Sequence, residues 1–134
     1  MSSNTTRQNI SSGGAYEAVF GYSRAVRIGA HIHVSGTCAP VGHEKSDVYT
    51  QTHAALAIIG KALAEGKGGW ADVIRTVVYV KDMNEAENVA RAHVEIFGAI
   101  RPASTLVQVD GFMRPWQKVE IEAYAILGAA PASA

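Results

Sequence analysis

Apolar and polar residues alternate along the last part of the chain, residues 118–127. Read with a period of two, this run puts Glu120 and Glu122 on one side of an extended strand. The other side is apolar and consists of Val119, Ile121, Ala123 and Ala125. Residues 104–109 alternate in the same way, and the turn-rich residues 110–115 connect the two runs. The pattern therefore predicts a closing pair of strands, which we expect to form one wall of any functional site.

Strand-like runs also occupy the first third of the chain. Residues 16–20 fit a short edge strand. Residues 22–28 and 31–36 lie on either side of a two-residue break that contains Gly29, which is typical of a hairpin. Residues 37–45 include Pro40 and Gly42 and are expected to form a loop.

Two segments have the period of an amphipathic helix. Asp47 is expected to cap the first helix, which ends at the glycines of residues 66–69. Its buried stripe is Val48, Thr52, Ala55, Ile59 and Leu63. Asn84 and Glu87 resemble a capping box for the second helix, which ends at Gly98. Its inward side is predicted to carry Ala86, Val89, Ala90, His93 and Phe97.

Between the helices, residues 71–81 are so rich in β-branched side chains that they predict a central strand. The element order is ββαβαββ, an α+β fold with one sheet and two helices on one face. Val77 and Tyr79 alternate with Val78 and Val80, so the uncovered face is apolar enough to need a partner, and self-association is expected. We predict a flexible segment at residues 1–14, one domain at residues 15–128 and a frayed tail at residues 129–134.

Composition narrows the class of function. The 134 residues include 12 basic and 12 acidic side chains, so the formal net charge is zero. A protein that binds nucleic acid by neutralising phosphates would have a basic excess, so no nucleic-acid partner is expected. Neither a signal peptide nor a membrane span is visible, which predicts a cytoplasmic protein without a membrane partner. Cys38 is the sole cysteine, has no cation nearby in the sequence, and is expected to be unreactive.

Four motifs occur in a characteristic order across residues 16–127: Gly21-Tyr22-Ser23-Arg24-Ala25, Val34-Ser35-Gly36, the run 101–107 that begins Arg101-Pro102-Ala103, and Val119-Glu120-Ile121-Glu122-Ala123. Together they resemble the Rid family of reactive intermediate deaminases, also called YjgF or L-PSP proteins. The resemblance implies a chorismate-mutase-like fold and a homotrimer with a cleft at each subunit interface. It also implies hydrolysis of imines and enamines, such as 2-aminoacrylate, to 2-keto acids and ammonia without a cofactor.

The resemblance assigns roles residue by residue. Glu120 matches the carboxylate that orients the attacking water, Tyr22 the tyrosine beside the substrate, and Ser35 the end of a strand near the site. For Tyr22 and Ser35, packing is the alternative role. The deaminating branch has an arginine directly after Pro-Ala, which binds the substrate's carboxylate, whereas this chain has Ser104. Arg101, three positions earlier, is not counted as the same residue.

The missing arginine predicts a substrate other than a standard 2-imino acid. Two arginines are candidates to replace the missing cation: Arg24, which shares a strand side with Tyr22, and Arg114. For each of them, the alternative is an arginine that is exposed to solvent and binds no ligand. The expected substrate-binding set is Tyr22, Arg24, Ser35, Ser104, Thr105, Leu106 and Arg114, with Glu120 catalytic.

Two other functions compete with a hydrolase. One is a protein that binds a small metabolite in the interface cleft without turnover, and the other is an endoribonuclease or translation inhibitor, which the zero net charge counts against. His31, His33 and His43 invite a metal site, but no acidic or cysteine pattern completes one, so no metal is expected. His93 is interpreted as a hydrogen-bonded core residue.

Overall fold

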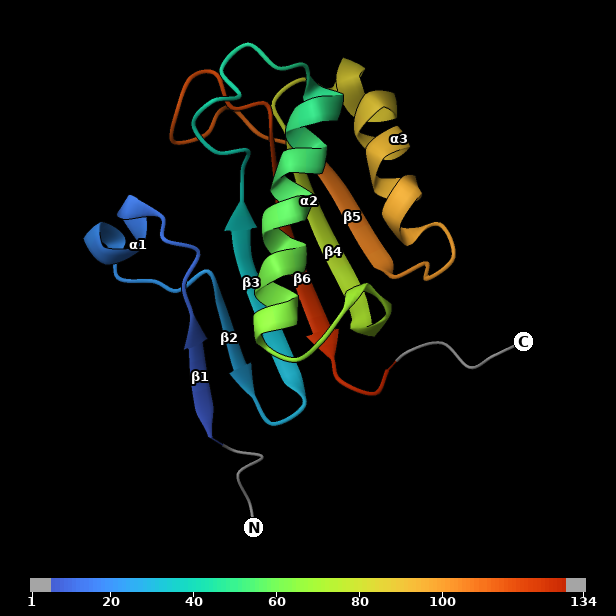
Figure 1. Ribbon diagram of the computed structural model, residues 1–134. Coiled ribbons are helices and arrows are strands. Elements are labelled where there is room, and N and C mark those ends of the chain that lie inside the picture. The colour runs from blue at the N-terminus through green and yellow to red at the C-terminus, as the bar shows by residue number, and fades with distance from the viewer. Residues whose placement is uncertain (1–5, 130–134) are drawn as a thin grey trace.

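The computed structural model describes residues 6–129. One mixed sheet of six strands carries the two longer helices on one face (Figure 1). In chain order the elements are β1 (Arg7–Ile10), α1 (Ala15–Phe20), β2 (Ala25–Ile28), β3 (His31–Thr37), α2 (Val48–Glu65), β4 (Val73–Val80), α3 (Ala86–Phe97), β5 (Ala103–Gln108) and β6 (Val119–Ile126). From β2 onward this is the predicted order ββαβαββ, with short 3-10 turns at Trp70–Asp72 and Met83–Glu85.

The last strand of the chain lies inside the sheet. The strand order is β1-β2-β3-β6-β4-β5, with β6 antiparallel to both β3 and β4 and with β5 parallel to β4. The predicted closing pair is therefore wrong as a pair, because β4 separates β5 from β6. Burial explains the arrangement: every second side chain of β6 is buried, as suits a central strand, whereas β5 is mostly exposed and forms an edge.

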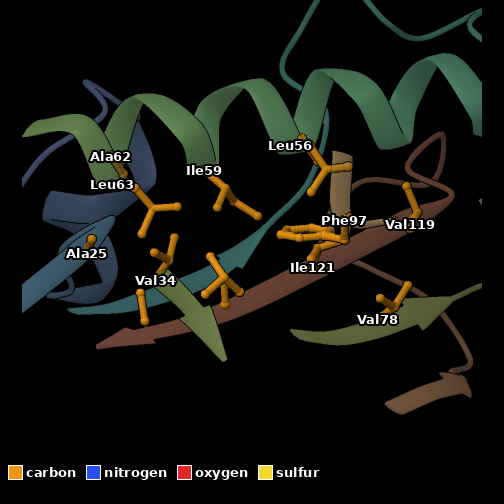
Figure 2. Close-up of a cluster of buried hydrophobic side chains, with 14 of the residues drawn as sticks. Ala25, Val34, Leu56, Ile59, Ala62, Leu63, Val78, Phe97, Val119 and Ile121 are labelled. Carbon is orange, nitrogen blue, oxygen red and sulfur yellow. The ribbon is translucent and has the colours of Figure 1, made fainter. Parts of the chain in front are cut away.

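The core fills the space between α2 and the sheet (Figure 2). Leu56, Ile59 and Leu63 point from the helix toward side chains of β3, β4 and β6, among them Val34, Val78 and Ile121. All five residues of the predicted helix stripe are buried. Asp47 caps α2 as predicted, since its carboxylate accepts a hydrogen bond of 2.8 Å from the Thr50 amide.

The second helix begins later than its predicted capping box. Asp82, not Asn84, caps the 3-10 turn that leads into α3, because its carboxylate accepts a hydrogen bond of 3.0 Å from the Asn84 amide. The helix is also turned relative to the prediction, so that Ala90 is exposed and Ala92 is fully buried. Ala90 instead lines a groove beside β5, described below.

The N-terminal part belongs to the fold, contrary to the predicted flexible segment at residues 1–14. Residues 1–5 lie outside the described range, but Arg7–Ile10 pairs with β2 and Ile10 is buried. Of the predicted frayed tail, only Ala129 is described.

A helix, α1, replaces the edge strand predicted at residues 16–20, and its ends explain why. Glu17 accepts a hydrogen bond of 3.2 Å from the Gly14 amide, and Gly21, at a φ of 86°, ends the helix. Five residues are too short a run for their period to distinguish a helix from a strand.

The sheet face opposite α2 and α3, which we call the open face, is less apolar than predicted. Tyr79 donates a hydrogen bond of 2.7 Å to Glu122, which raises the pKa of the Tyr79 hydroxyl to about 12. The rings of His33 and Tyr124 stack with their centres 4.3 Å apart. These partly buried polar and aromatic groups leave a surface suited to a polar partner. No helix within residues 6–129 is long and apolar enough to cross a membrane.

Candidate functional site

Glu120 lies on the open face near the start of β6, against the backbone of β3. A methyl group on Gly36 would come within 2.9 Å of the Glu120 carboxyl carbon, so a glycine is required for this contact. The register of β3 against β6 shifts between Val34 and Thr37, which takes Ser35 and Gly36 out of the regular ladder. The strand irregularity thus creates the space that the Glu120 carboxylate occupies.

Cys38 is the second neighbour of this carboxylate. Its thiol donates a hydrogen bond to Glu120 Oε2 over 3.6 Å. Burial, followed by the negative charge of Glu120, raises the pKa of the thiol to about 12. Cys38 is therefore a protonated donor and not a nucleophile, in agreement with the prediction that it is unreactive. Its contact with Glu120 could not be foreseen, because 82 residues separate the two in sequence.

Arg24 is buried beside these residues, and protein groups occupy most of its guanidinium. Nη1 donates to the Gly36 carbonyl (2.6 Å) and the Thr37 hydroxyl (2.9 Å), and Nη2 donates to the Tyr22 hydroxyl (2.7 Å). Nε donates to the Ser12 hydroxyl over 3.3 Å. Four of its five N–H groups thus have partners, and Arg24 holds the walls of the site together.

Tyr22 and Ser35 are also tied to their neighbours. The Tyr22 ring lies against the Arg24 guanidinium, whose carbon is 5.2 Å from the ring centre, which places both on one side as predicted. Ser35 donates its hydroxyl proton to the Ser23 carbonyl over 2.7 Å. We call Tyr22, Arg24, Gly36, Cys38 and Glu120 the glutamate site.

Ser104 and Leu106 face the opposite way. They pair in register with Thr76 and Val78, both of which are buried on the helix-covered face. A groove of about 420 Å³ lies here between α3 and β5. Its lining comprises Val78, Val89, Ala90, His93, Val94, Phe97, Gly98, Arg101, Pro102, Ser104 and Leu106. We call it the α3/β5 groove; its volume lies within the usual range for small-molecule sites.

A chain of three polar side chains runs into this groove. The Ser104 and Thr76 hydroxyls are 2.8 Å apart, and Thr76 Oγ1 is 3.0 Å from His93 Nε2. Burial lowers the pKa of His93, which keeps its imidazole neutral near pH 7. The predicted hydrogen bond of His93 is confirmed, but the residue is only partly buried and lines the groove instead of the core. Its connection to Ser104 was not predicted.

The remaining predicted site residues lie elsewhere. Thr105 is on the open face of the edge strand, where its hydroxyl accepts a hydrogen bond of 3.1 Å from Arg75. Arg114 is exposed on the loop after β5, and its amide donates to Gln117 over 3.0 Å. The structure therefore divides the predicted set. Tyr22, Arg24 and Glu120 belong to the glutamate site, and Ser35 is bonded next to it, to the Ser23 carbonyl. Ser104 and Leu106 line the groove, and Thr105 and Arg114 join neither group.

The histidines considered as metal ligands have other neighbours. His31 Nδ1 is 2.6 Å from the Tyr124 hydroxyl, and His43 Nδ1 is 3.1 Å from the Ser46 hydroxyl. Within residues 6–129, no group of three or more His, Cys, Asp or Glu side chains is arranged to hold a metal ion.

The fold and these polar regions define an α+β protein with a single mixed sheet and a groove beside its edge strand. The sequence profile of the family described as Endoribonuclease L-PSP matches residues 13–127. The chain therefore belongs to this family, the YjgF/Rid family.

Relatives and solved structures agree with the family assignment. SCO2049 of Streptomyces coelicolor is 39% identical over 129 residues, which cover 92% of this chain and 96% of that protein. A mouse protein named 2-iminobutanoate/2-iminopropanoate deaminase is 31% identical, over 94% of this chain and 96% of its own. The fold also matches the crystal structure of Rv2704 from Mycobacterium tuberculosis, a member of the YjgF/YER057c/UK114 family, with a TM-score of 0.86 and 40% sequence identity. The match covers 91% of this chain and 100% of Rv2704.

Proposed function

We propose that this protein hydrolyses small imines or enamines without a cofactor, with Glu120 orienting the attacking water. The observation that carries the proposal is the Glu120 carboxylate, which is half-buried and held between Gly36 and the Cys38 thiol. A carboxylate fixed in this way can accept a proton from water at one defined position. The deaminase name of the mouse relative supports the same class of reaction.

The reaction needs only water and a proton carrier. Water adds its oxygen to the imine carbon while Glu120 accepts one of the water's protons, and the imine nitrogen takes up a proton. The tetrahedral carbinolamine then collapses: its hydroxyl proton is transferred to the nitrogen by way of Glu120, the carbon–nitrogen bond breaks, ammonia leaves, and a carbonyl forms. An enamine enters the same route after protonation at carbon.

We propose further that the working site forms between copies of the chain, in a homotrimer. The glutamate site lies on the open face, whereas Ser104 and Leu106 lie on the helix-covered side of the edge strand. One chain cannot bring both to one small ligand, but the open face of one copy can approach the α3/β5 groove of the next. The partly buried polar groups of the open face suit such a contact.

The decisive experiment compares Glu120→Gln with Glu122→Gln. Both carboxylates lie on the same side of β6, but Glu122 is paired with Tyr79. We expect Glu120→Gln to lower the rate of ammonia release from an imine generated in situ by about a hundredfold or more. Glu122→Gln should retain most of the rate, and light scattering should give a trimer mass for both variants. Full turnover by Glu120→Gln would refute the mechanism, and a monomer mass for the unmodified protein would refute the interface site.

A binding protein without turnover is the second candidate. The observation in its favour is that Arg24 is occupied by protein groups, which leaves the glutamate site with little free positive charge for a substrate. Tight binding of a keto acid together with no ammonia release from any imine would support it. The family's endoribonuclease description is a third possibility, but the zero net charge of the chain counts against it. Cleavage of an RNA substrate by the purified protein would reveal this activity.

A further inference from the structure

Three aromatic rings form a row that leads outward from the glutamate site: Tyr22, Phe20 and Tyr16, which we call the aromatic row. Phe20 and Tyr22 meet edge to face with their ring centres 6.1 Å apart, and Tyr16 and Phe20 are stacked at 5.9 Å. Both distances lie in the usual range for paired aromatic side chains. The row begins at a residue of the site, because the Tyr22 ring lies against the Arg24 guanidinium.

The outer part of the aromatic row is exposed. Phe20 is 73% exposed and Tyr16 is 40% exposed. Large apolar groups left in water are informative where they adjoin a functional site. Figure 1 shows α1, the helix that carries both rings, on the side of the molecule with β1 and β2 and apart from α2 and α3. A ligand that reaches the glutamate site can therefore also contact these rings.

The short helix α1 is anchored to the glutamate site by buried polar groups. Glu17, which is 7% exposed, accepts a hydrogen bond of 2.6 Å from the Ser12 hydroxyl. The oxygen of this hydroxyl accepts a hydrogen bond of 3.3 Å from Arg24 Nε. Arg24 also donates to the carbonyl of Gly36, the residue against which the Glu120 carboxylate packs. This chain of contacts holds the aromatic row in a fixed position relative to Glu120.

The charges at the glutamate site favour a substrate without a carboxylate. Arg24 is the one cation among the five residues of the site, and four of its five N–H groups already donate to protein groups. The charge of Glu120 would repel a second carboxylate beside it. The aromatic row offers a different kind of contact, since a planar apolar group can pack against its rings.

We infer that the substrate is an uncharged imine with an aromatic group, and that Phe20 and Tyr16 select it by packing against this group. This inference rests on the proposed function and names the substrate class of the glutamate site. The imine end of such a substrate enters the site beside Glu120, and its aromatic group extends along α1.

Benzophenone imine, an isolable imine with two phenyl rings and no carboxylate, tests this assignment. Water converts it to benzophenone and ammonia, so the enzymatic rate is the ammonia release above the uncatalysed rate. We expect its kcat/KM to exceed that of 2-iminopropanoate generated in situ from alanine by an amino acid oxidase. Phe20→Ala should raise KM for benzophenone imine about tenfold and leave kcat within about a factor of two, because the lost contact stabilises ground state and transition state alike. KM for 2-iminopropanoate should not change.

Three further variants separate the ring from mere apolar surface. Val19→Ala is the matched control, because Val19 is 76% exposed on the same helix but has no ring, and its KM values should equal those of the unmodified protein. Phe20→Tyr keeps the ring and should keep KM for benzophenone imine. Phe20→Leu keeps apolar area without a ring, and its KM should lie between those of the unmodified protein and Phe20→Ala.

An unchanged KM in Phe20→Ala, or a higher kcat/KM for 2-iminopropanoate than for benzophenone imine, would overturn the assignment. A change of mass in Phe20→Ala, measured by light scattering, would also overturn it, because Phe20 would then pack against another copy of the chain. Loss of ammonia release in Glu120→Gln alongside an unchanged KM in Phe20→Ala would leave the proposed hydrolase intact and reject only the role of the aromatic row. No ammonia release from either imine by the unmodified protein would reject the hydrolase and this inference together.

Discussion

The thiol of Cys38 donates a hydrogen bond to the carboxylate of Glu120 over 3.6 Å. The bond joins the loop after β3 to the start of β6 and fixes one oxygen of the carboxylate on which the proposed mechanism depends. Because burial and the charge of Glu120 both oppose loss of the thiol proton and raise the thiol pKa to about 12, Cys38 stays protonated and remains a hydrogen-bond donor to Glu120.

Alkylation of Cys38 should report this pairing. A pKa raised from 9.0 to about 12 reduces the thiolate fraction at pH 8 by about a thousandfold, so iodoacetamide should modify the folded protein far more slowly than the unfolded chain. Glu120→Gln removes the negative charge, lowers the thiol pKa and should accelerate the reaction several-fold. Mass spectrometry against time measures both rates, and equal rates in the two folded proteins would mean that the carboxylate does not act on the thiol.

Gly36→Ala should impair activity without unfolding the protein. The added methyl would meet the Glu120 carboxyl carbon at 2.9 Å, so the end of a flexible side chain must move. We expect kcat to fall by about tenfold or more, with a Tm change of a few degrees at most. Gly111→Ala, where no atom lies within 4 Å of the new methyl, is the control. A Gly36→Ala variant with unchanged kcat would show that the exact position of the carboxylate is unimportant.

Gly60→Ala should destabilise the protein, although alanine normally favours a helix by about 1 kcal/mol over glycine. Gly60 lies within α2, and a methyl there would come within 2.5 Å of Trp70 Cζ2. Overpacking against a large ring costs about 1–3 kcal/mol, which outweighs the helix preference. Thermal unfolding should give a Tm several degrees lower than that of Gly69→Ala, where the new methyl has no neighbour within 4 Å. A Tm above that of the unmodified protein would contradict the tight packing of Trp70 on α2.

His93 should make stability depend on pH. Burial places its pKa in the folded protein below the ordinary value of 6.5, so the unfolded chain binds the proton more readily. The contribution to stability is fully present above pH 6.5 and is lost as the pH falls below it, toward the lowered pKa. Unfolding by urea at pH 7.5 and pH 5.5 should show this decline, and His93→Gln should reduce it. An equal decline in His93→Gln would assign it to other groups.

The sequence predicted those features that local patterns determine. Alternation placed every buried residue of β6 correctly, and Asp47 capped α2 as its side chain implied. The separation of β5 from β6 could not be predicted, because strand pairing depends on which surface is better buried and not on the connecting turn. The place of Arg101 beside the α3/β5 groove could not be predicted either, because the groove forms only when α3 packs beside β5 in the folded chain.

The place of β6 also determines when this protein can fold. β6 joins β3 to β4. The two parts of the sheet, β1-β2-β3 and β4-β5, therefore cannot be connected until residues 119–126 have been synthesised. While these residues remain within the ribosome, β3 and β4 each have an unpaired edge, and the apolar side of α2 lacks much of its cover. A chain that stops before residue 119 would therefore keep two separate groups of strands, β1-β2-β3 and β4-β5, without the strand that joins them into one sheet.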